Sequence, residues 1–191
     1  MARFGRGRPL APDWLRPIRF SQSTHILKQD IVFRYSGGAN NNLIDNSIGG
    51  AMSSVRIVDN VLSNLWDTVT TAQEASGVIN YACIYVLNNT PTGKTWGSAV
   101  LWIDGQLSQG SLAVGLDSAA VGATAVSSST DIHTAPSPTI TFSSPSNRST
   151  ALVIGDIPAG SYKAFWVQRT IPSSSSSGSD QGSLHCEGST T

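Results

Sequence analysis

Charged side chains are scarce in this sequence. Asp, Glu, Lys and Arg together make up 13% of its 191 residues, and aromatic residues make up only 7%. The 12 basic and 12 acidic residues balance to a formal net charge of zero, so no overall field draws the chain to nucleic acid or to a membrane. The shortage of Glu and Lys also argues against a helical enzyme.

Cysteines and long apolar runs are scarce as well. Cys83 lies in an apolar run and Cys186 in a polar segment, so the pair indicates no disulfide framework, and a mutual bridge stays open. No stretch approaches the roughly 18 apolar residues of a membrane span. The first residues contain no continuous apolar core, so we expect no signal peptide and a soluble protein made in the cytoplasm.

Motifs that carry catalysis are missing too. The sequence has no Gly-x-Ser-x-Gly elbow, P-loop or dinucleotide fingerprint. Asp104, Asp117 and Asp156 fall at turns beside Gly or Ser, where Asp usually bonds to the backbone. The segment "LHCE" (184–187) is a weak metal signal without a partner cluster. We therefore expect no enzyme, no cofactor and no metal site.

What the chain does have is an uneven distribution of charge. Residues 1–34 hold seven basic and two acidic residues, 7 − 2 = +5, and the remainder holds five basic and ten acidic residues, 5 − 10 = −5. Three prolines in this stretch favour an extended backbone. We predict an extended basic arm that docks on an acidic partner. The candidate partner-binding residues are Arg3, Arg6, Arg8, Trp14, Leu15, Arg16, Ile18, Arg19 and Phe20.

Two alternatives for this arm stay open. Its apolar residues could pack against the arm's own domain instead of a partner subunit. The segment "GRGRP" (5–9) could contact nucleic acid, because small basic arms neutralise phosphates. The acidic body and the lack of interleaved aromatic residues disfavour that second alternative.

From Val78 onward the pattern is that of short strands separated by Gly, Pro, Asn and Ser. Abundant Gly, Ser, Thr and Ala are typical of extracellular or virion β proteins. Strands are predicted at Val78–Asn89, Trp96–Ile103, Ser111–Leu116, Thr139–Pro145, Thr150–Pro158 and after Ser161. About seven strands at this spacing predict an all-β fold, an antiparallel β-sandwich or jelly-roll-like body. Residues 35–172 form that domain, between the 1–34 arm and a Ser/Gly-rich tail, 173–191.

Four local predictions complete this organisation. The Val78–Asn89 strand is apolar on both faces, which predicts a central strand buried between two layers. In the last strand Tyr162, Ala164 and Trp166 share one face, opposite Phe165 and Val167. Helical spacing in residues 60–69 indicates a short helix or a looped turn. Residues 173–178 read as a solvated tail, and the role of 184–186 is left open.

Four segments, in one order along the chain, carry a resemblance to a known group. They are "GGAMSS" (49–54), "NLWDTVTTAQEASGVINYACIYVLNN" (64–89), "AVLWI" (99–103) and "IGDIPAGSYKAFWVQRTIP" (154–172). Together they resemble a group of tailed-bacteriophage virion structural proteins, over residues 36–172. The sequence departs from the group at Ala82, where Arg is frequent, which puts a shared charge contact in doubt.

The resemblance implies a non-enzymatic part of a virion, assembled in the host cytoplasm. A capsid decoration (cement) protein is the leading expectation, with the major capsid protein or other virion proteins as partners and a homo-oligomer, dimer or trimer, as its state. A neck, collar or tail accessory or fibre protein is one alternative. The other is a carbohydrate-binding β-sandwich in which Trp96, Trp102 and Tyr162 form a stacking platform.

Overall fold

The computed structural model describes residues 25–58, 65–66, 69–175 and 181–191. Seven strands dominate these residues: β1 (Ile31–Tyr35), β2 (Val78–Asn88), β3 (Trp96–Gly105), β4 (Ser111–Leu116), β5 (Leu152–Ile157), β6 (Tyr162–Ile171) and β7 (Ser183–Thr190). The helical elements are the α-helix α1 (Thr71–Ser76) and two 3-10 turns, η2 (Lys28–Asp30) and η3 (Ile44–Asn46).

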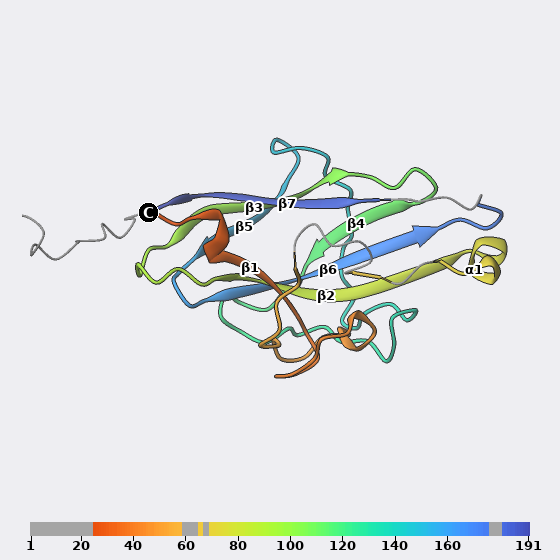
Figure 1. The fold of residues 1–191 in the computed structure, drawn as a ribbon, viewed down its shortest axis with the longest axis horizontal. Helices are drawn as coiled ribbons and strands as arrows, with labels where there is room; N and C mark the ends of the chain where they lie inside the picture. The colour runs from red at the N-terminus through yellow and green to blue at the C-terminus, as the bar shows by residue number, and fades with distance from the viewer. Residues whose placement is uncertain (1–24, 59–64, 67–68, 176–180) are drawn as a thin grey trace, which may run out of the picture.

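The strands form two antiparallel sheets that pack face to face (Figure 1). One sheet has four strands in the order β1-β2-β6-β4, and the other has three in the order β5-β3-β7. Every strand pair in both sheets is antiparallel. The predicted all-β sandwich is confirmed.

A core of apolar side chains fills the space between the sheets. Its fully buried members come from both sides, and they include Ile84 and Val86 of β2, Leu101 of β3 and Phe165 of β6. Alternate residues of each strand point to one face, so these side chains meet across the sandwich. Because burying such a side chain is worth about 1.5–3 kcal/mol, this core is the main source of stability.

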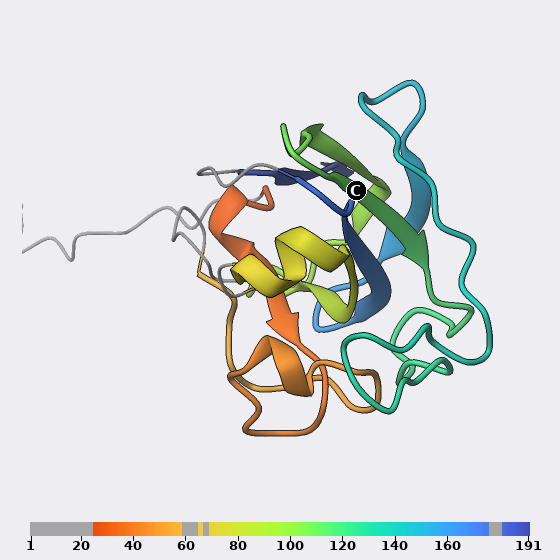
Figure 2. The ribbon, with the colours of Figure 1, turned by 90° about the vertical axis from the view of Figure 1, so that its right-hand side faces the viewer.

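A layer of loops covers the outer face of the four-stranded sheet. Cys83, Tyr85 and Trp166 point to this face and are fully buried there with Ile140. Figures 1 and 2 show two loop regions side by side below the sheet, one after β1 and one between β4 and β5. Strands β2 and β6 are therefore buried on both faces, as the apolar pattern of Val78–Asn89 predicts.

The predicted faces of the last strand are also confirmed. Phe165 and Val167 belong to the core between the sheets, whereas Ala164 and Trp166 belong to the cluster under the loop layer. Tyr162 packs against that second cluster, and its ring meets Tyr85 edge to face at a centroid distance of 5.3 Å.

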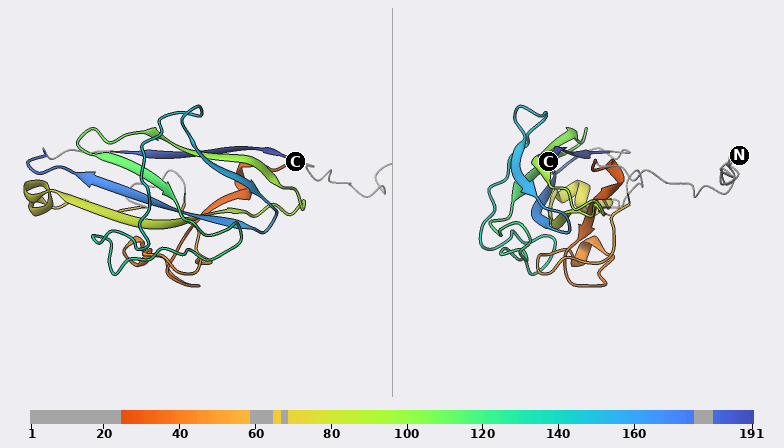
Figure 3. Two further views of the ribbon diagram at one scale, coloured as in Figure 1. Left: turned by 180° about the vertical axis from the view of Figure 1, so that it is seen from behind. Right: turned by 90° about the vertical axis from the view of Figure 1, so that its left-hand side faces the viewer.

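The predicted strand Thr139–Pro145 does not form. The structure gives this segment one isolated bridge, between Ser143 and Val114 of β4. Gly115 explains the difference, because a Cβ there would lie 2.3 Å from Ile140 and 2.6 Å from the Thr141 carbonyl oxygen. The missing side chain lets the segment lie flat on β4 and cross to the other sheet, as the view from behind shows (Figure 3).

Both ends of the sandwich extend beyond the predicted domain of residues 35–172. Strand β1 begins at Ile31, inside the predicted arm, and pairs with β2 from Ile31↔Asn88 to Tyr35↔Ile84. Strand β7 lies inside the predicted tail and pairs with β3. Its alternate residues Leu184 and Cys186 pack against the core, which answers the question left open for 184–186.

Other predictions are only partly within the described residues. The helix or turn predicted at 60–69 lies mostly outside them, and α1 begins after it, capped by the Thr70 side chain, which accepts from the Gln73 N–H. Both cysteines are free. No helix in the described residues has the length and apolar character needed to cross a membrane.

Gly188 of β7 provides a test of how tightly this strand is packed. A Cβ at this position would lie 2.3 Å from Nε1 of Trp96, a rigid indole that is only 4% exposed. We expect Gly188→Ala to lower the free energy of unfolding by about 1–3 kcal/mol, because the core has no room for the methyl group. Urea denaturation measures this, with the exposed Ser183→Ala as control, and equal stability of the two variants would contradict the packing of β7 on Trp96.

Candidate functional site

The most highly connected buried polar group is the carboxylate of Asp117, which is 1% exposed. One oxygen accepts from the backbone N–H groups of Ala119 (2.8 Å) and Val126 (2.9 Å). The other accepts from the Ser127 N–H (3.0 Å) and from the Trp166 indole N–H (3.2 Å). Burial alone would raise the pKa of Asp117, but these hydrogen bonds outweigh it and hold the pKa below its usual range.

The neighbours of Asp117 also bind loops rather than a ligand. The Tyr85 hydroxyl donates to the Gly50 carbonyl (2.5 Å) and accepts from the Ala125 N–H (2.7 Å), so it joins both loop regions to β2. Lys163 donates to the Ala119 carbonyl, and burial lowers the pKa of its ammonium while Asp117 opposes that shift. This network holds the loop layer on the sheet, which confirms the expectation that Asp117 serves the backbone.

A second polar cluster lies at the start of β2. Oδ1 of the buried Asn80 accepts from Nε (3.1 Å) and Nη2 (2.9 Å) of Arg169. The Arg169 guanidinium also lies 5.1 Å from the ring centroid of Trp66, within cation–π range. On its other side Asn80 contacts Nδ1 of His133 at 3.1 Å. The cluster joins β2 and β6 to the loop residues Trp66 and His133, and the Nδ1 atom of the His133 imidazole is taken up by its contact with Asn80.

Two surface hollows in the described part of the chain have no ionisable group in their lining. One, of about 350 Å³, is lined mainly by Ser, Thr, Pro, Ile and Leu between β4 and the crossing segment. The other, of about 600 Å³, is lined by the Gly- and Asn-rich loop that includes Asn40 and Asn42. Acid–base catalysis needs a titratable side chain at the reacting group, and neither lining supplies one. Among the described residues, no three His, Cys, Asp or Glu side chains gather where they could hold a metal ion.

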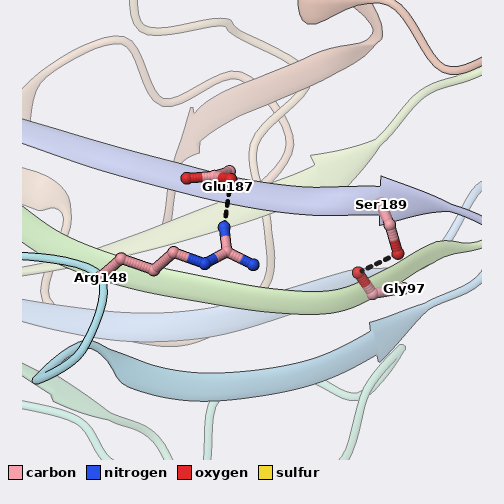
Figure 4. Close-up of polar contacts among 4 residues, drawn as sticks. All are labelled: Gly97, Arg148, Glu187 and Ser189. Carbon is pink, nitrogen blue, oxygen red and sulfur yellow. Dashed lines mark hydrogen bonds and ion pairs between the residues drawn. The ribbon is translucent and has the colours of Figure 1, made fainter.

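The outer face of the β5-β3-β7 sheet, in contrast, is open. Val153 of β5 is 72% exposed, and the β7 side chains Ser183, His185, Glu187 and Ser189 are all exposed. Arg148, from the loop before β5, lies over β3 and pairs with Glu187 (Figure 4). Nearby, the Ser189 hydroxyl donates to the Gly97 carbonyl (3.2 Å). Since both partners of the Arg148–Glu187 pair are largely exposed, the pair adds at most about 1 kcal/mol.

The aromatic residues proposed for a carbohydrate platform do not form one. Trp96 is 4% exposed and lies in the core, as the apolar strands favoured. Trp102 is 7% exposed, and the His185 ring stacks on it with a centroid distance of 4.2 Å and an interplanar angle of 25°. Tyr162 is half-buried on the opposite sheet. A sugar has no exposed indole face here on which to stack.

His133, His185 and the rest of the "LHCE" segment do not come together in the fold. His133 lies beside Asn80, and His185 lies in β7, away from it. Within "LHCE", Cys186 points toward the core, whereas His185 and Glu187 point to the open face. The alternation of a strand therefore separates the three side chains that the sequence places together.

The candidate partner-binding residues of the arm, Arg3 to Phe20, all lie outside the described residues. The structure does show where the arm joins the body. The N–H of Ile26 donates to Oγ1 of Thr190 (3.1 Å), at the end of β7, and the Asp30 carbonyl accepts from the Asn89 N–H (2.8 Å). The candidate site is therefore this junction together with the edge and open face of β7, which sequence reasoning missed because the tail is so polar.

The Asp117 network predicts a pH-dependent contribution to stability. In Asp117→Asn an NH₂ group would replace one oxygen and face N–H donors, so we expect a loss of about 1–3 kcal/mol at pH 7. The pKa of Asp117 is lower in the folded chain than its value of about 3.9 in an unfolded one. The contribution is therefore complete above that value and is lost as the pH falls through the folded pKa.

Urea denaturation at a series of pH values measures this difference. The gap between Asp117→Asn and the natural chain should narrow below about pH 4, where the unfolded carboxyl also takes up its proton. Asp104→Asn, which changes an exposed carboxylate on β3, is the matched control and should leave stability within about 0.5 kcal/mol. A gap that stays constant down to the acid transition would exclude a charged Asp117 as the anchor of the loop layer.

Comparisons with protein-family models, with curated protein sequences and with solved structures found no match for this chain.

Proposed function

We propose that this chain is a structural protein of a bacteriophage virion, a capsid decoration protein that binds the head shell through its N-terminal arm. The observation that supports this most directly is that the buried polar groups and the basic excess lie in different parts of the chain. The buried polar groups of the body hold its own loops, while the basic excess of +5 lies in residues 1–34 against −5 in the rest. Such a chain is built to adhere to another surface rather than to transform a substrate.

The attachment of the arm fits this role. Ile26 packs against the core and its N–H is bonded to Thr190, so the chain joins the body directly after the segment that we propose as the docking arm. An arm that becomes ordered on binding covers a large surface for its length. A shell repeats the same acidic docking surface many times, so a modest contact for each copy adds up across the particle.

The resemblance to tailed-phage virion proteins supports the same proposal through the fold. Residues 78–88, 99–103 and 162–171 of the resembling segments are strand residues of β2, β3 and β6, at the centre of the sandwich. The proposed partner is the major capsid protein or another virion protein. Neck, collar or tail proteins are the alternative location, distinguished below by copy number.

A truncation tests the arm. Removing residues 2–24 should abolish incorporation into particles and leave the body folded, because Ile26 and Asp30, which bond to the body, are kept. Particles made by a phage that carries the truncated gene are purified and their protein content is quantified by mass spectrometry. The circular dichroism spectrum and urea midpoint of the purified chain report the fold.

A second variant separates the effect of the arm's charge from the effect of its length. Changing Arg3, Arg6, Arg8, Arg16 and Arg19 to Glu keeps the length of the arm and reverses the sign of the charge that the proposal assigns to docking. We expect this variant to be missing from particles as well. Full incorporation of the truncated chain would refute the arm as the anchor.

The copy number in particles of the natural chain tests the location. A decoration protein should be present at about the number of shell subunits, whereas a neck or tail protein should be present in a small fixed number. Absence of the chain from purified particles would overturn the proposed function. Binding on a glycan array, lost in Trp102→Ala but kept in the core variant Ile103→Val, would favour the carbohydrate alternative instead.

A further inference from the structure

The edges of the two sheets differ in how well they are protected against pairing with another chain. The outer edge of β1 is covered, because Ser53 and Ile57 donate to the carbonyls of Tyr35 (2.8 Å) and Phe33 (2.9 Å). The outer edge of β4 is covered by Ser143, which exchanges two hydrogen bonds with Val114 (2.8 and 3.0 Å). Both edges are therefore closed to a further strand at these positions.

The edge of β5 is interrupted instead of covered. Gly155 has a φ of +91°, and the register with β3 shifts at this point. The next residue, Asp156, turns its carboxylate to the Ser98 N–H (2.8 Å). A bulge and a charge on a six-residue strand are the usual means by which proteins block edge-to-edge pairing.

Strand β7 is less protected. Its register with β3 shifts twice, but the extra residues lie on β3 and leave β7 itself without a bulge, and its one carboxylate, Glu187, is paired with Arg148. The strand is eight residues long, contains no Pro, Lys or Arg, and keeps a regular alternation of exposed and half-buried residues. Within the described part of the chain its ladder partner is β3 alone. A long, regular edge of this kind is a template for pairing with another strand.

The ladder with β3 determines which backbone N–H and C=O groups of β7 point to its open edge. Thr191 and Thr95 exchange two hydrogen bonds (3.0 and 3.1 Å), so the polar groups of Thr191 point to β3. With the two-residue period of a strand, those of Ser189, Glu187 and His185 point the same way. The N–H and C=O groups of Leu184, Cys186 and Gly188 therefore point to the open edge.

We propose that β7 pairs antiparallel with β7 of a second copy of this chain, with Cys186 of the two copies directly opposite each other. This register uses the edge-pointing groups of Leu184, Cys186 and Gly188 for hydrogen bonds. It also spans nearly the whole strand, because Ser183 then lies opposite Ser189 of the second copy. The two three-stranded sheets become one continuous sheet across the interface.

Charge complementarity selects this register over its neighbours. With Cys186 at the centre, each His185 lies opposite Glu187 of the second copy on the open face of the sheet. A register centred on Glu187 would place two carboxylates opposite each other, and one centred on His185 would place two imidazoles together. Two carboxylates opposite each other are destabilising in a ladder and two imidazoles gain nothing from each other, whereas an imidazole N–H can donate to a carboxylate, so a His–Glu pair supports the ladder.

The pairing closes on itself, because each copy uses one edge and the two copies are related by a two-fold axis. It goes beyond the proposed function and is measured on the purified chain without particles, so either can fail alone. If both hold, the dimer carries two arms, because each Ile26 lies at the end of a β7. The arms then leave from opposite ends of the interface.

Disulfide trapping tests the register. His185→Cys and Glu187→Cys are made separately, each with Cys186→Ser, in chains of different tag length. Cys83 is fully buried and remains in place. Positions 185 and 187 form a non-hydrogen-bonded pair in the proposed ladder, with Cα atoms about 4.5 Å apart, which suits a disulfide. Mild oxidation of the mixture should give a covalent heterodimer, and oxidation of either protein alone should not.

Other cross-links would overturn this register. Cross-linking of the Glu187→Cys protein with itself would centre the ladder on 187, and cross-linking of the His185→Cys protein with itself would centre it on 185. A mixture of Glu187→Cys and Ser189→Cys chains, both with Cys186→Ser, is the matched control and should stay uncross-linked. Reactivity there would centre the ladder on 188.

A charge-swap experiment tests the pairing in the otherwise natural chain. Light scattering should give a dimer for the full chain, and His185→Glu should weaken the dimer about tenfold, because it places like charges opposite each other twice. Adding Glu187→Lys together with Arg148→Glu restores opposite charges across the ladder without placing two cations side by side in one copy, and should restore the dimer. A structural effect of losing the His185 stack on Trp102 would not be rescued by these further changes.

Three other outcomes would each contradict the proposed pairing of β7 with β7 of a second copy. A monomer at every soluble concentration would overturn the proposal. A dimer that persists in His185→Glu with unchanged affinity would place the interface elsewhere. If truncation of residues 2–24 dissolves the dimer while the body stays folded, the occupant of the β7 edge is the N-terminal segment and not β7 of the second copy.

Discussion

The ladder between β2 and β6 is the interaction on which the rest of this structure depends. It runs without a break from Val78↔Ile171 to Leu87↔Tyr162, and both strands present buried side chains on both faces. On one face these side chains meet the three-stranded sheet, and on the other they meet the loop layer. A slip of one residue would exchange the two sets and would place Trp166 in the space shaped for Phe165. The register of this single pair therefore determines both layers at once.

That double burial also explains where the buried polar side chains of the body make their hydrogen bonds. A loop layer packed on a sheet must satisfy its own backbone groups, and Asp117 and Tyr85 bond to such groups, whereas Asn80 contacts the side chain of the loop residue His133. These hydrogen bonds hold the loop layer on the sheet. The β7 side chains on the outer face of the second sheet are exposed by contrast.

The central strands could be predicted from sequence because their signal is local. Val78–Asn88 is continuously apolar, and the strands around it are bounded by Gly, Pro and Asn. The sequence places β1 at the end of the predicted arm and β7 in the predicted tail, because each strand is held by pairing with a strand that is far away in the sequence, β2 and β3 respectively. In β7 only Leu184 and Cys186 mark the inner face, and Gly188 is inner because it makes room for Trp96. The strand predicted at Thr139–Pro145 is absent for a different reason. Its apolar and polar residues do alternate, but Gly115 lets the segment cross over β4 instead of pairing along it. The candidate arm residues lie outside the described residues, so their prediction stays untested.

The junction at Ile26 has a mechanical consequence. A load applied to the N-terminal segment enters the body there and is then directed along the axis of β1, which is held to β2 by five consecutive residue pairs. Because the ladder bonds lie across the strand, such a load shears them together and does not open them one after another. Tension carried along β1 would therefore load all five pairs with β2 at once.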